Sequence, residues 1–205
     1  MRILLVDDHP VVRFGIRQIL VEGLKDVFVG EANDAAGAAA NLFRHEWDLV
    51  ILDVSLPGMS GLDVLKNIRR ERPELPVLVL SMHPAAHFER RAVAAGAAAY
   101  LTKDSAPTEL VKAIEEIRQG RGRYDGRQRE AAAPATRPLH DALSDREYQV
   151  LRMIGSGRSV SEIADSFGLS VKTVSTYRSR LLEKMRMRTN AELMRYAIEH
   201  RLVDS

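Results

Sequence analysis

Five short apolar segments, separated by longer segments with helical spacing, constrain the fold of the first 119 residues more than any other feature. These apolar segments predict strands at residues 3–7, 27–30, 49–53, 77–81 and 98–102. Segments with a helical period follow them at residues 11–20, 35–43, 62–70, 86–95 and 108–118. Apolar strands that alternate with helices are typical of a parallel sheet covered on both faces. We therefore expect an α/β fold, a doubly wound (βα)5 domain with an open parallel sheet.

The sequence changes character after residue 120. Residues 121–142 contain Gly, Arg, Ala and Pro without periodic apolar positions, which predicts a flexible linker between domains at residues 1–120 and 143–205. Every segment of the second domain has helical spacing, so we expect a small all-α domain of four helices. Ser144 and Glu147 have the spacing of a capping box, which predicts a helix that continues to about residue 154. The other expected helices are residues 160–167, 171–185 and 190–200, with a tight turn at 168–170.

Composition narrows the classes of function. The chain has 205 residues, enough for two small domains, and 45% of them are hydrophobic, which is the usual balance of a globular protein. It contains no cysteine, which excludes disulfides, thiolate nucleophiles and zinc–cysteine sites. The sequence has no apolar run of the roughly 18 to 20 residues that a membrane helix needs and no signal-peptide pattern, so we expect a cytoplasmic protein.

The two halves of the chain differ in charge. Residues 1–119 hold 14 Lys and Arg against 17 Asp and Glu, whereas residues 120–205 hold 16 against 11. The net charges are therefore −3 and +5. A basic half suits an anionic partner such as nucleic acid, although solvated basic faces are also common.

Polar residues stand where the predicted strands of the first domain end. The first strand ends in Asp7 and Asp8, the third in Asp53 and the fourth in Ser81, and the fifth is followed by Lys103. Open α/β sheets bind ligands at this edge, so we expect the five side chains to share one crevice. Three carboxylates in one crevice repel one another unless a cation joins them. Mg²⁺ or another hard divalent cation is the expected occupant.

These residue types can carry phosphoryl transfer. A carboxylate attacks phosphorus when Mg²⁺ neutralises the charge that develops on the phosphoryl oxygens, which makes Asp53 the candidate nucleophile. Lys103 would supply a second positive charge, and the Ser81 hydroxyl would donate a hydrogen bond to a phosphoryl oxygen.

Four of these five residues also have a structural alternative. Asp7 and Asp8 could cap the first helix. Lys103 could be a solvated surface lysine, and Ser81 could be an ordinary strand-end hydroxyl. The coincidence of all five side chains at the strand ends of one sheet favours the phosphoacceptor interpretation.

Three segments of the first domain resemble those of receiver domains, and the whole chain resembles a NarL/FixJ-type response regulator. The segments are residues 5–9, 52–61 and 99–103, with the sequences LVDDH, LDVSLPGMSG and AYLTK. The resemblance implies a flavodoxin-like receiver over residues 1–120. It also implies that a sensor histidine kinase, or a small phosphodonor, phosphorylates Asp53.

The resemblance further implies roles for individual residues. Asp8 and Asp53 would bind the metal directly together with the Ser55 carbonyl, and Asp7 would hold it through water. The Ser81 hydroxyl would turn toward the phosphoryl group while the Tyr100 ring turns inward. From the residues alone, the ring is expected to be a partly buried strand aromatic.

Two neighbouring positions also bear on the site. Ser55 follows Asp53 by two residues, and His83 follows Ser81 by two residues. In receiver domains, which this segment resembles, side chains at these two places vary widely and influence how long the phosphoryl group survives.

The second domain contains a helix, a glycine-containing turn and a second helix over residues 161–185, which is the order of a DNA-binding helix-turn-helix. Residues 161–164 and 169–174, SEIA and LSVKTV, resemble the LuxR-type module that NarL/FixJ proteins place after a receiver. The resemblance covers residues 143–203. It implies double-stranded DNA as the partner.

The helix at residues 171–185 has two expected faces. An apolar stripe predicted to face the core consists of Val174, Leu181, Leu182 and Met185. The expected DNA contacts, with hydroxyls near base edges and basic side chains near phosphates or guanine, are Lys172, Thr173, Ser175, Thr176, Arg178, Ser179 and Arg180. The structural alternative is a solvated helix face. Many family members have lysine where this chain has Ser175, so no particular operator is implied.

The last predicted helix has an apolar stripe of its own, formed by Leu193, Met194, Ala197 and Ile198. From the pattern alone we expect this stripe to pack in the domain core. The family resemblance adds a dimer contact near this helix, and hence a homodimer when the protein is phosphorylated or bound to DNA. Palindromic or repeated half-sites would follow.

Three functions are open at this stage. The first is a transcription regulator that is switched by phosphorylation of Asp53, and not an enzyme beyond transfer and loss of its own phosphoryl group. The second is a phosphatase with an aspartyl-phosphate intermediate, but such enzymes need an acid two residues after the nucleophile, where this chain has Ser55. The third is a constitutive DNA-binding regulator whose receiver does not switch.

Overall fold

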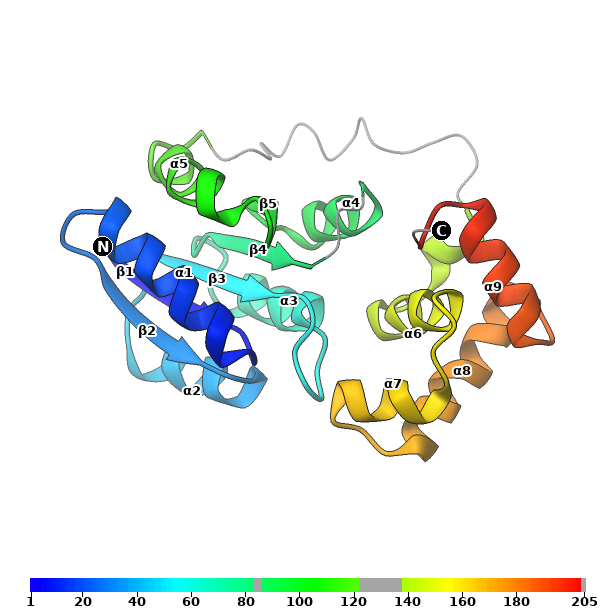
Figure 1. Cartoon of the computed structure of the whole chain (residues 1–205). Helices are drawn as coiled ribbons and strands as arrows, with labels where there is room; N and C mark the ends of the chain where they lie inside the picture. Colours follow the sequence, from blue (N-terminus) through cyan, green and yellow to red (C-terminus); the bar gives the residue numbers. More distant parts are fainter. Residues whose placement is uncertain (83–85, 122–137, 204–205) are drawn as a thin grey trace. The chain divides into compact units, whose positions relative to one another are not determined.

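The computed structural model describes residues 1–82, 86–121 and 138–203 (Figure 1). The chain divides into two compact units, Met1–Ala132 and Ala133–Ser205. Each unit has buried apolar side chains of its own. Residues 122–137, most of the predicted linker, lie outside the described residues.

Unit 1 contains a five-stranded parallel sheet. Its strands are β1 (Arg2–Val6), β2 (Phe28–Ala32), β3 (Leu49–Asp53), β4 (Val77–Ser81) and β5 (Ala99–Thr102). They lie in the order β2-β1-β3-β4-β5, and every neighbouring pair is parallel. The predicted doubly wound α/β domain is therefore confirmed, with strand ends that differ from the predicted ones by at most two residues.

Helices cover both faces of this sheet (Figure 1). They are α1 (Pro10–Gly23), α2 (Ala35–Arg44), α3 (Gly61–Glu71), α4 (Ala86–Ala95) and α5 (Ala106–Arg118). α1 and α5 pack on one face, against alternate strand residues such as Ile3 and Leu5. α5 begins two residues earlier than predicted because Pro107 lies in its first turn. A backbone N–H has no partner within the helix at that position, so a proline, which has no N–H, is tolerated there.

The sheet contains a reversal point between β1 and β3. These two strands are neighbours, although β2 follows β1 in the chain. The chain therefore leaves β1 in one direction across the sheet and leaves β3 in the other, which opens a crevice at their carboxyl ends. Asp7 and Asp8 follow β1 and Asp53 ends β3, so all three stand at this crevice.

Unit 2 is helical. Its helices are α6 (Asp145–Gly155), α7 (Val160–Phe167), α8 (Val171–Met185) and α9 (Asn190–Glu199). The predicted capping box is present at α6, where Ser144 Oγ accepts from the Glu147 N–H and the Glu147 carboxylate accepts from the Ser144 N–H. Equivalent boxes begin α7 and α9. Among the described residues, no helix has both the length and the apolar character needed to cross a membrane.

A left-handed glycine joins α7 to α8. Gly168 has φ 61° and ψ 34°, a conformation that glycine adopts without steric cost and that ends α7. Two residues later Ser170 caps α8, because its Oγ accepts from the Thr173 N–H at 3.1 Å. The predicted helix-turn-helix is therefore present. Its second helix buries Val174, Leu181 and Met185, whereas the fourth residue of the predicted stripe, Leu182, is only half-buried.

Two details of unit 2 differ from the prediction. Residues 139–142, predicted to be linker, form the 3-10 helix Leu139–Ala142, and its His140 is buried with Nδ1 2.9 Å from the Tyr196 hydroxyl of α9. Ile198 was expected in the core with Leu193 but is 54% exposed. Tyr196 is buried instead, because the core side of α9 faces the 3-10 helix.

Gly61 approaches the backbone of β3 too closely for a side chain. A Cβ at residue 61 would lie 2.0 Å from the Asp53 carbonyl oxygen.

We expect Gly61→Ala to lower the free energy of unfolding of unit 1 by about 2–3 kcal/mol, because backbone atoms must move. Urea denaturation followed by fluorescence of Trp47, the only tryptophan in the sequence, measures the change. Gly15→Ala is the control: its Cβ meets nothing within 4 Å, so it should stabilise by up to about 1 kcal/mol. Equal midpoints for wild type and Gly61→Ala would contradict the close approach.

Glu147 gives unit 2 a stability that depends on pH. Burial would raise the pKa of its carboxyl, but the hydrogen bonds from Lys184 and from the Ser144 N–H outweigh burial, so the pKa is lowered. The unfolded chain therefore takes up this proton first, and unit 2 should lose stability as pH falls below 4.5, the ordinary value of the group.

We expect Glu147→Gln to destabilise unit 2 at pH 7 by about 1–2 kcal/mol and to flatten the pH dependence in this acidic range. The measurement is urea denaturation followed by far-UV circular dichroism, which reports both units. Trp47 fluorescence reports unit 1 alone, so the circular dichroism transition that it does not follow belongs to unit 2. Glu162→Gln, the same box position on the exposed start of α7, should have a smaller effect. An unchanged pH dependence in Glu147→Gln would contradict the assignment.

Candidate functional site

The three carboxylates predicted to converge do so at the carboxyl edge of the sheet. Oxygens of Asp7, Asp8 and Asp53 and a ring nitrogen of His9 all lie within 4.8 Å of one another. Asp7 and Asp53 are buried, whereas the Asp8 side chain is 29% exposed. We call these four residues the acidic cluster.

The carboxylate of Asp53 has a fixed orientation. Its Oδ1 accepts the Ser55 N–H at 3.1 Å, and its Oδ2 accepts from the Lys103 ammonium at 2.8 Å. The Gly61 N–H donates to the Val54 carbonyl at 3.0 Å, which holds the start of α3 against the end of β3. Both oxygens of Asp53 therefore have donors, and the backbone beneath the carboxylate is fixed.

Lys103 is buried between two carboxylates. Its Nζ lies 2.7 Å from Asp7 Oδ2 and 2.8 Å from Asp53 Oδ2, and its side chain is 5% exposed. The alternative of a solvated surface lysine is therefore wrong. Burial alone would lower the pKa of Lys103, but the attraction of Asp53 and the hydrogen bonds to both carboxylates outweigh it and raise the pKa. Burial raises the pKa of Asp53, and the Lys103 charge offsets this only in part.

The acidic cluster fits a hard divalent cation. Mg²⁺ binds oxygens at about 2.0–2.1 Å, so ligands on opposite sides of one ion lie about 4.2 Å apart, which is close to the span of the cluster. The buried Asp8 Oδ1 accepts no hydrogen bond from the described residues, although His9 Nδ1 lies 2.7 Å away. Lys103 balances one of the three carboxylate charges, and the two that remain match a divalent ion.

Neither aspartate after β1 caps the first helix. α1 begins at Pro10 with His9 at the N-cap position, and no side chain makes a capping hydrogen bond there. Asp7 Oδ1 instead accepts the His9 N–H at 2.8 Å. The capping alternative is therefore wrong. His9 was not among the ligands expected from the sequence, although its place directly after the two aspartates was an available signal.

Ser81 and Tyr100 occupy neighbouring strands at the same end of the sheet. Ser81 ends β4 one residue beyond the register partner of Asp53, is fully buried, and its carbonyl accepts the Lys103 N–H at 2.7 Å. Tyr100 on β5 is 5% exposed, so it is more deeply buried than the strand pattern predicted. His83 lies outside the described residues.

Most of the predicted DNA-contacting residues lie on the solvent side of α8. Thr173 is half-buried, and the exposed members are Lys172, Ser175, Thr176, Ser179 and Arg180. Arg178 differs, because it falls on the side of the buried Val174 and its Nε donates to Asn190 Oδ1 of α9 at 2.6 Å. Arg178 therefore links α8 to α9.

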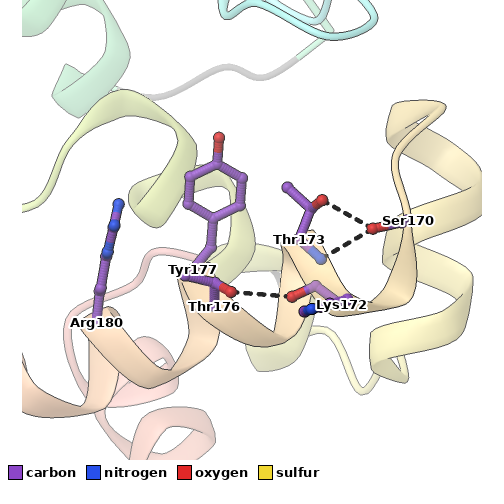
Figure 2. A pocket seen from close by; sticks show the side chains of 6 residues that line it. All are labelled: Ser170, Lys172, Thr173, Thr176, Tyr177 and Arg180. Atoms are coloured by element: carbon purple, nitrogen blue, oxygen red, sulfur yellow. Dashed lines mark hydrogen bonds between the residues drawn. The ribbon is translucent and has the colours of Figure 1, made fainter.

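A hollow of about 290 Å³ lies along α8 (Figure 2). Its lining consists of Ser170, Lys172, Thr173, Thr176, Tyr177 and Arg180. Two cationic side chains and four hydroxyl groups thus meet without a carboxylate among them. Tyr177 was not among the DNA contacts expected from the sequence. Its spacing from Thr173 and Arg180, four residues and three residues, places all three on one side of a helix and was an available signal.

Comparisons with known families agree with this division into two sites. Residues 3–115 match the model of the response regulator receiver domain. Residues 141–197 match the model of the bacterial regulatory proteins of the luxR family. The first match contains the acidic cluster with Lys103, and the second contains α8.

Individual proteins match over the full chain. The response regulator UvrY of Escherichia coli (strain K12) is 36% identical over 214 residues, which cover 100% of this chain and 97% of UvrY. The response regulator GacA of Pseudomonas aeruginosa is 36% identical over 215 residues, with coverages of 100% and 99%. A structure of RcsB from Salmonella enterica serovar Typhimurium, bound to promoter rprA in the presence of the phosphomimetic BeF3⁻, has a TM-score of 0.62 at 30% identity, with coverages of 96% and 98%. The chain therefore belongs to the NarL/FixJ family of two-component response regulators, with a receiver domain followed by a LuxR-type DNA-binding domain.

Proposed function

We propose that transfer of a phosphoryl group to Asp53 controls sequence-specific DNA binding by unit 2. One observation carries the proposal: the Lys103 ammonium lies within 2.8 Å of both Asp53 and Asp7 at a buried edge of the sheet. Phosphorylation gives the Asp53 side chain further strong acceptor oxygens. Lys103 and a divalent cation are the groups within reach that would bind them, so the local contacts must rearrange.

The transfer itself is a nucleophilic displacement. An oxygen of the Asp53 carboxylate attacks phosphorus, the new O–P bond forms while the bond to the donor breaks, and the donor leaves with that electron pair. The donor is a phosphohistidine of a sensor histidine kinase, or a small molecule such as acetyl phosphate. The chain is a DNA-binding regulator and not a conventional enzyme. Transfer to its own side chain is the one reaction proposed for it.

A divalent cation, Mg²⁺ first, belongs to this proposal. Asp8, Asp53 and the Ser55 carbonyl would hold it directly, and Asp7 would hold it through water. When bound, it neutralises charge on the transferring phosphoryl oxygens. The Asp8 Oδ1, which accepts no hydrogen bond from the described residues, and the charge balance of the acidic cluster support this assignment.

Ser81 and Tyr100 are the proposed first elements of the switch. Ser81 is bonded through its carbonyl to the Lys103 N–H, so a displacement of Lys103 toward the phosphoryl group acts on the end of β4. The Ser81 hydroxyl would turn toward a phosphoryl oxygen. Tyr100 would turn inward into the space this leaves on the neighbouring strand.

The output is proposed to be binding of a homodimer to DNA half-sites. Lys172, Thr173, Ser175, Thr176, Ser179 and Arg180 would contact DNA directly, and Arg178 would orient α8 through Asn190. The exposed Ile198 on α9 supplies an apolar contact for a second copy.

A bacterial regulator that binds chromosomal DNA works in the cytoplasm. The proposed domain boundaries remain the end of the receiver at residue 120 and the start of the DNA-binding domain at residue 143. The 3-10 helix directly before residue 143 packs with the second domain.

Two other functions are less well supported. A phosphatase would need an acid two residues after Asp53, and Ser55 cannot protonate a leaving group efficiently at neutral pH. A constitutive regulator would not need the buried pairing of Lys103 with Asp7 and Asp53, which costs desolvation energy that a non-switching receiver could avoid.

Asp53→Ala tests the switch. Acetyl phosphate with Mg²⁺ should raise the DNA affinity of the wild type by about tenfold, within the usual range for coupled sites, and should leave Asp53→Ala unchanged. Fluorescence anisotropy with a duplex selected from a random pool by the wild type measures the affinity, and intact mass measures phosphoprotein. Asp63→Ala, which removes an exposed carboxylate of α3, is the matched control and should behave like the wild type. Equal gains in wild type and Asp53→Ala would leave the constitutive alternative.

A further inference from the structure

We propose that the hollow along α8 seats one backbone phosphate of bound DNA, with Tyr177 as its central donor; the inference rests on the proposed DNA binding by α8. Figure 2 shows Tyr177 and Arg180 extending to the same side of α8. Three donors of the lining make no hydrogen bond or ion pair within the described residues: the Lys172 ammonium, the Tyr177 hydroxyl and the Arg180 guanidinium.

The remaining hydroxyls of the lining are already engaged. Thr176 Oγ1 donates to the Lys172 carbonyl at 3.0 Å. The hydroxyl oxygens of Thr173 and Ser170 lie 2.8 Å apart, and Ser170 Oγ also accepts the Thr173 N–H. What the hollow offers to a ligand is therefore two cationic donors, one phenol and the one hydroxyl proton of the Ser170–Thr173 pair that is not donated within the pair. Such a set matches a ligand that only accepts hydrogen bonds and carries negative charge.

The position of Tyr177 on the helix favours a phosphate over a base edge. At 100° per residue, Tyr177 lies about 60° around α8 from the centre of the buried stripe, whereas Thr176 lies about 160° from it. Tyr177 is accordingly half-buried and Thr176 is exposed. A helix in the major groove points its most exposed side at the base edges and its flanks at the sugar-phosphate walls. Tyr177 is on such a flank.

The start of α8 adds positive potential to the hollow. The first turns of α6, α7 and α9 carry acidic residues, which balance the positive end of each helix. The first turn of α8 carries none, and Lys172 stands in it. The N-terminal end of α8 and the two side-chain charges therefore act on an anion in the same direction.

Tyr177→Phe removes the phenol hydroxyl and keeps the ring, so it tests the phosphate seat without changing the packing. The probes are a duplex selected from a random pool by the wild-type full-length chain and an unselected random duplex. Affinity for both should fall by about tenfold, because a phosphate contact carries no base information. Arg180→Gln should also weaken both and should reduce the slope of log affinity against log salt by about 0.9. Lys25→Gln, an exposed charge removed from unit 1, should leave the slope unchanged.

Single methylphosphonate substitutions in the selected duplex locate the contact. At one phosphate per half-site the wild type should lose affinity, while Tyr177→Phe should lose little more because its contact is already absent. If Tyr177→Phe weakens the selected duplex alone, and 7-deazaguanine at one position reproduces the loss, the hollow reads a guanine edge and the phosphate seat is wrong. Wild-type affinity of Tyr177→Phe for both duplexes overturns the inference as well. Failure of the wild type to bind any duplex would instead overturn the proposed function.

Discussion

The Lys103 ammonium between Asp7 and Asp53 is the interaction on which the receiver site depends. The three groups come from the ends of β1, β3 and β5, and they are all nearly excluded from water. A buried ion pair of this kind costs desolvation energy. That cost is offset when the geometry of the pair is good, or is accepted when the charge has a function. Here the geometry ties the carboxyl ends of three strands together. It also leaves two uncompensated carboxylate charges at the reversal point of the sheet.

The proposed phosphoryl transfer would change this arrangement at its centre. The carboxylate of Asp53 is oriented by the Ser55 N–H on one oxygen and by Lys103 on the other, so a new group on either oxygen would compete with one of these donors. Because Lys103 is bonded through its N–H to the Ser81 carbonyl, a proposed displacement of Lys103 would act directly on the end of β4. The proposed local change is thus electrostatic, and the strand ends are the elements that would carry it away from the site.

Polar contacts hold α8 at two places along its length. Near its end, Lys184 pairs with the buried Glu147 of the α6 capping box at 2.6 Å. In its middle, Arg178 donates to Asn190 at the start of α9. The apolar stripe of α8 fixes which side faces the core, and these two contacts fix its rotation and tilt against α6 and α9. The exposed side then has one orientation in which to meet DNA, which is the condition for sequence-specific contacts.

The sequence by itself determined the elements of both units, because these follow from local rules. The apolar period gave the strands and helices within a few residues, and the Ser144–Glu147 spacing predicted a capping box that the structure contains. It also determined that five chemically apt side chains stand at strand ends, since parallel strands bring their carboxyl ends to one edge. Only the tertiary structure decided which helix face is buried around the 3-10 helix, and hence that Ile198 is exposed and Tyr196 is not. The partner of Arg178, Asn190 of α9, was likewise undecided by spacing, because this contact forms only when the two helices pack together.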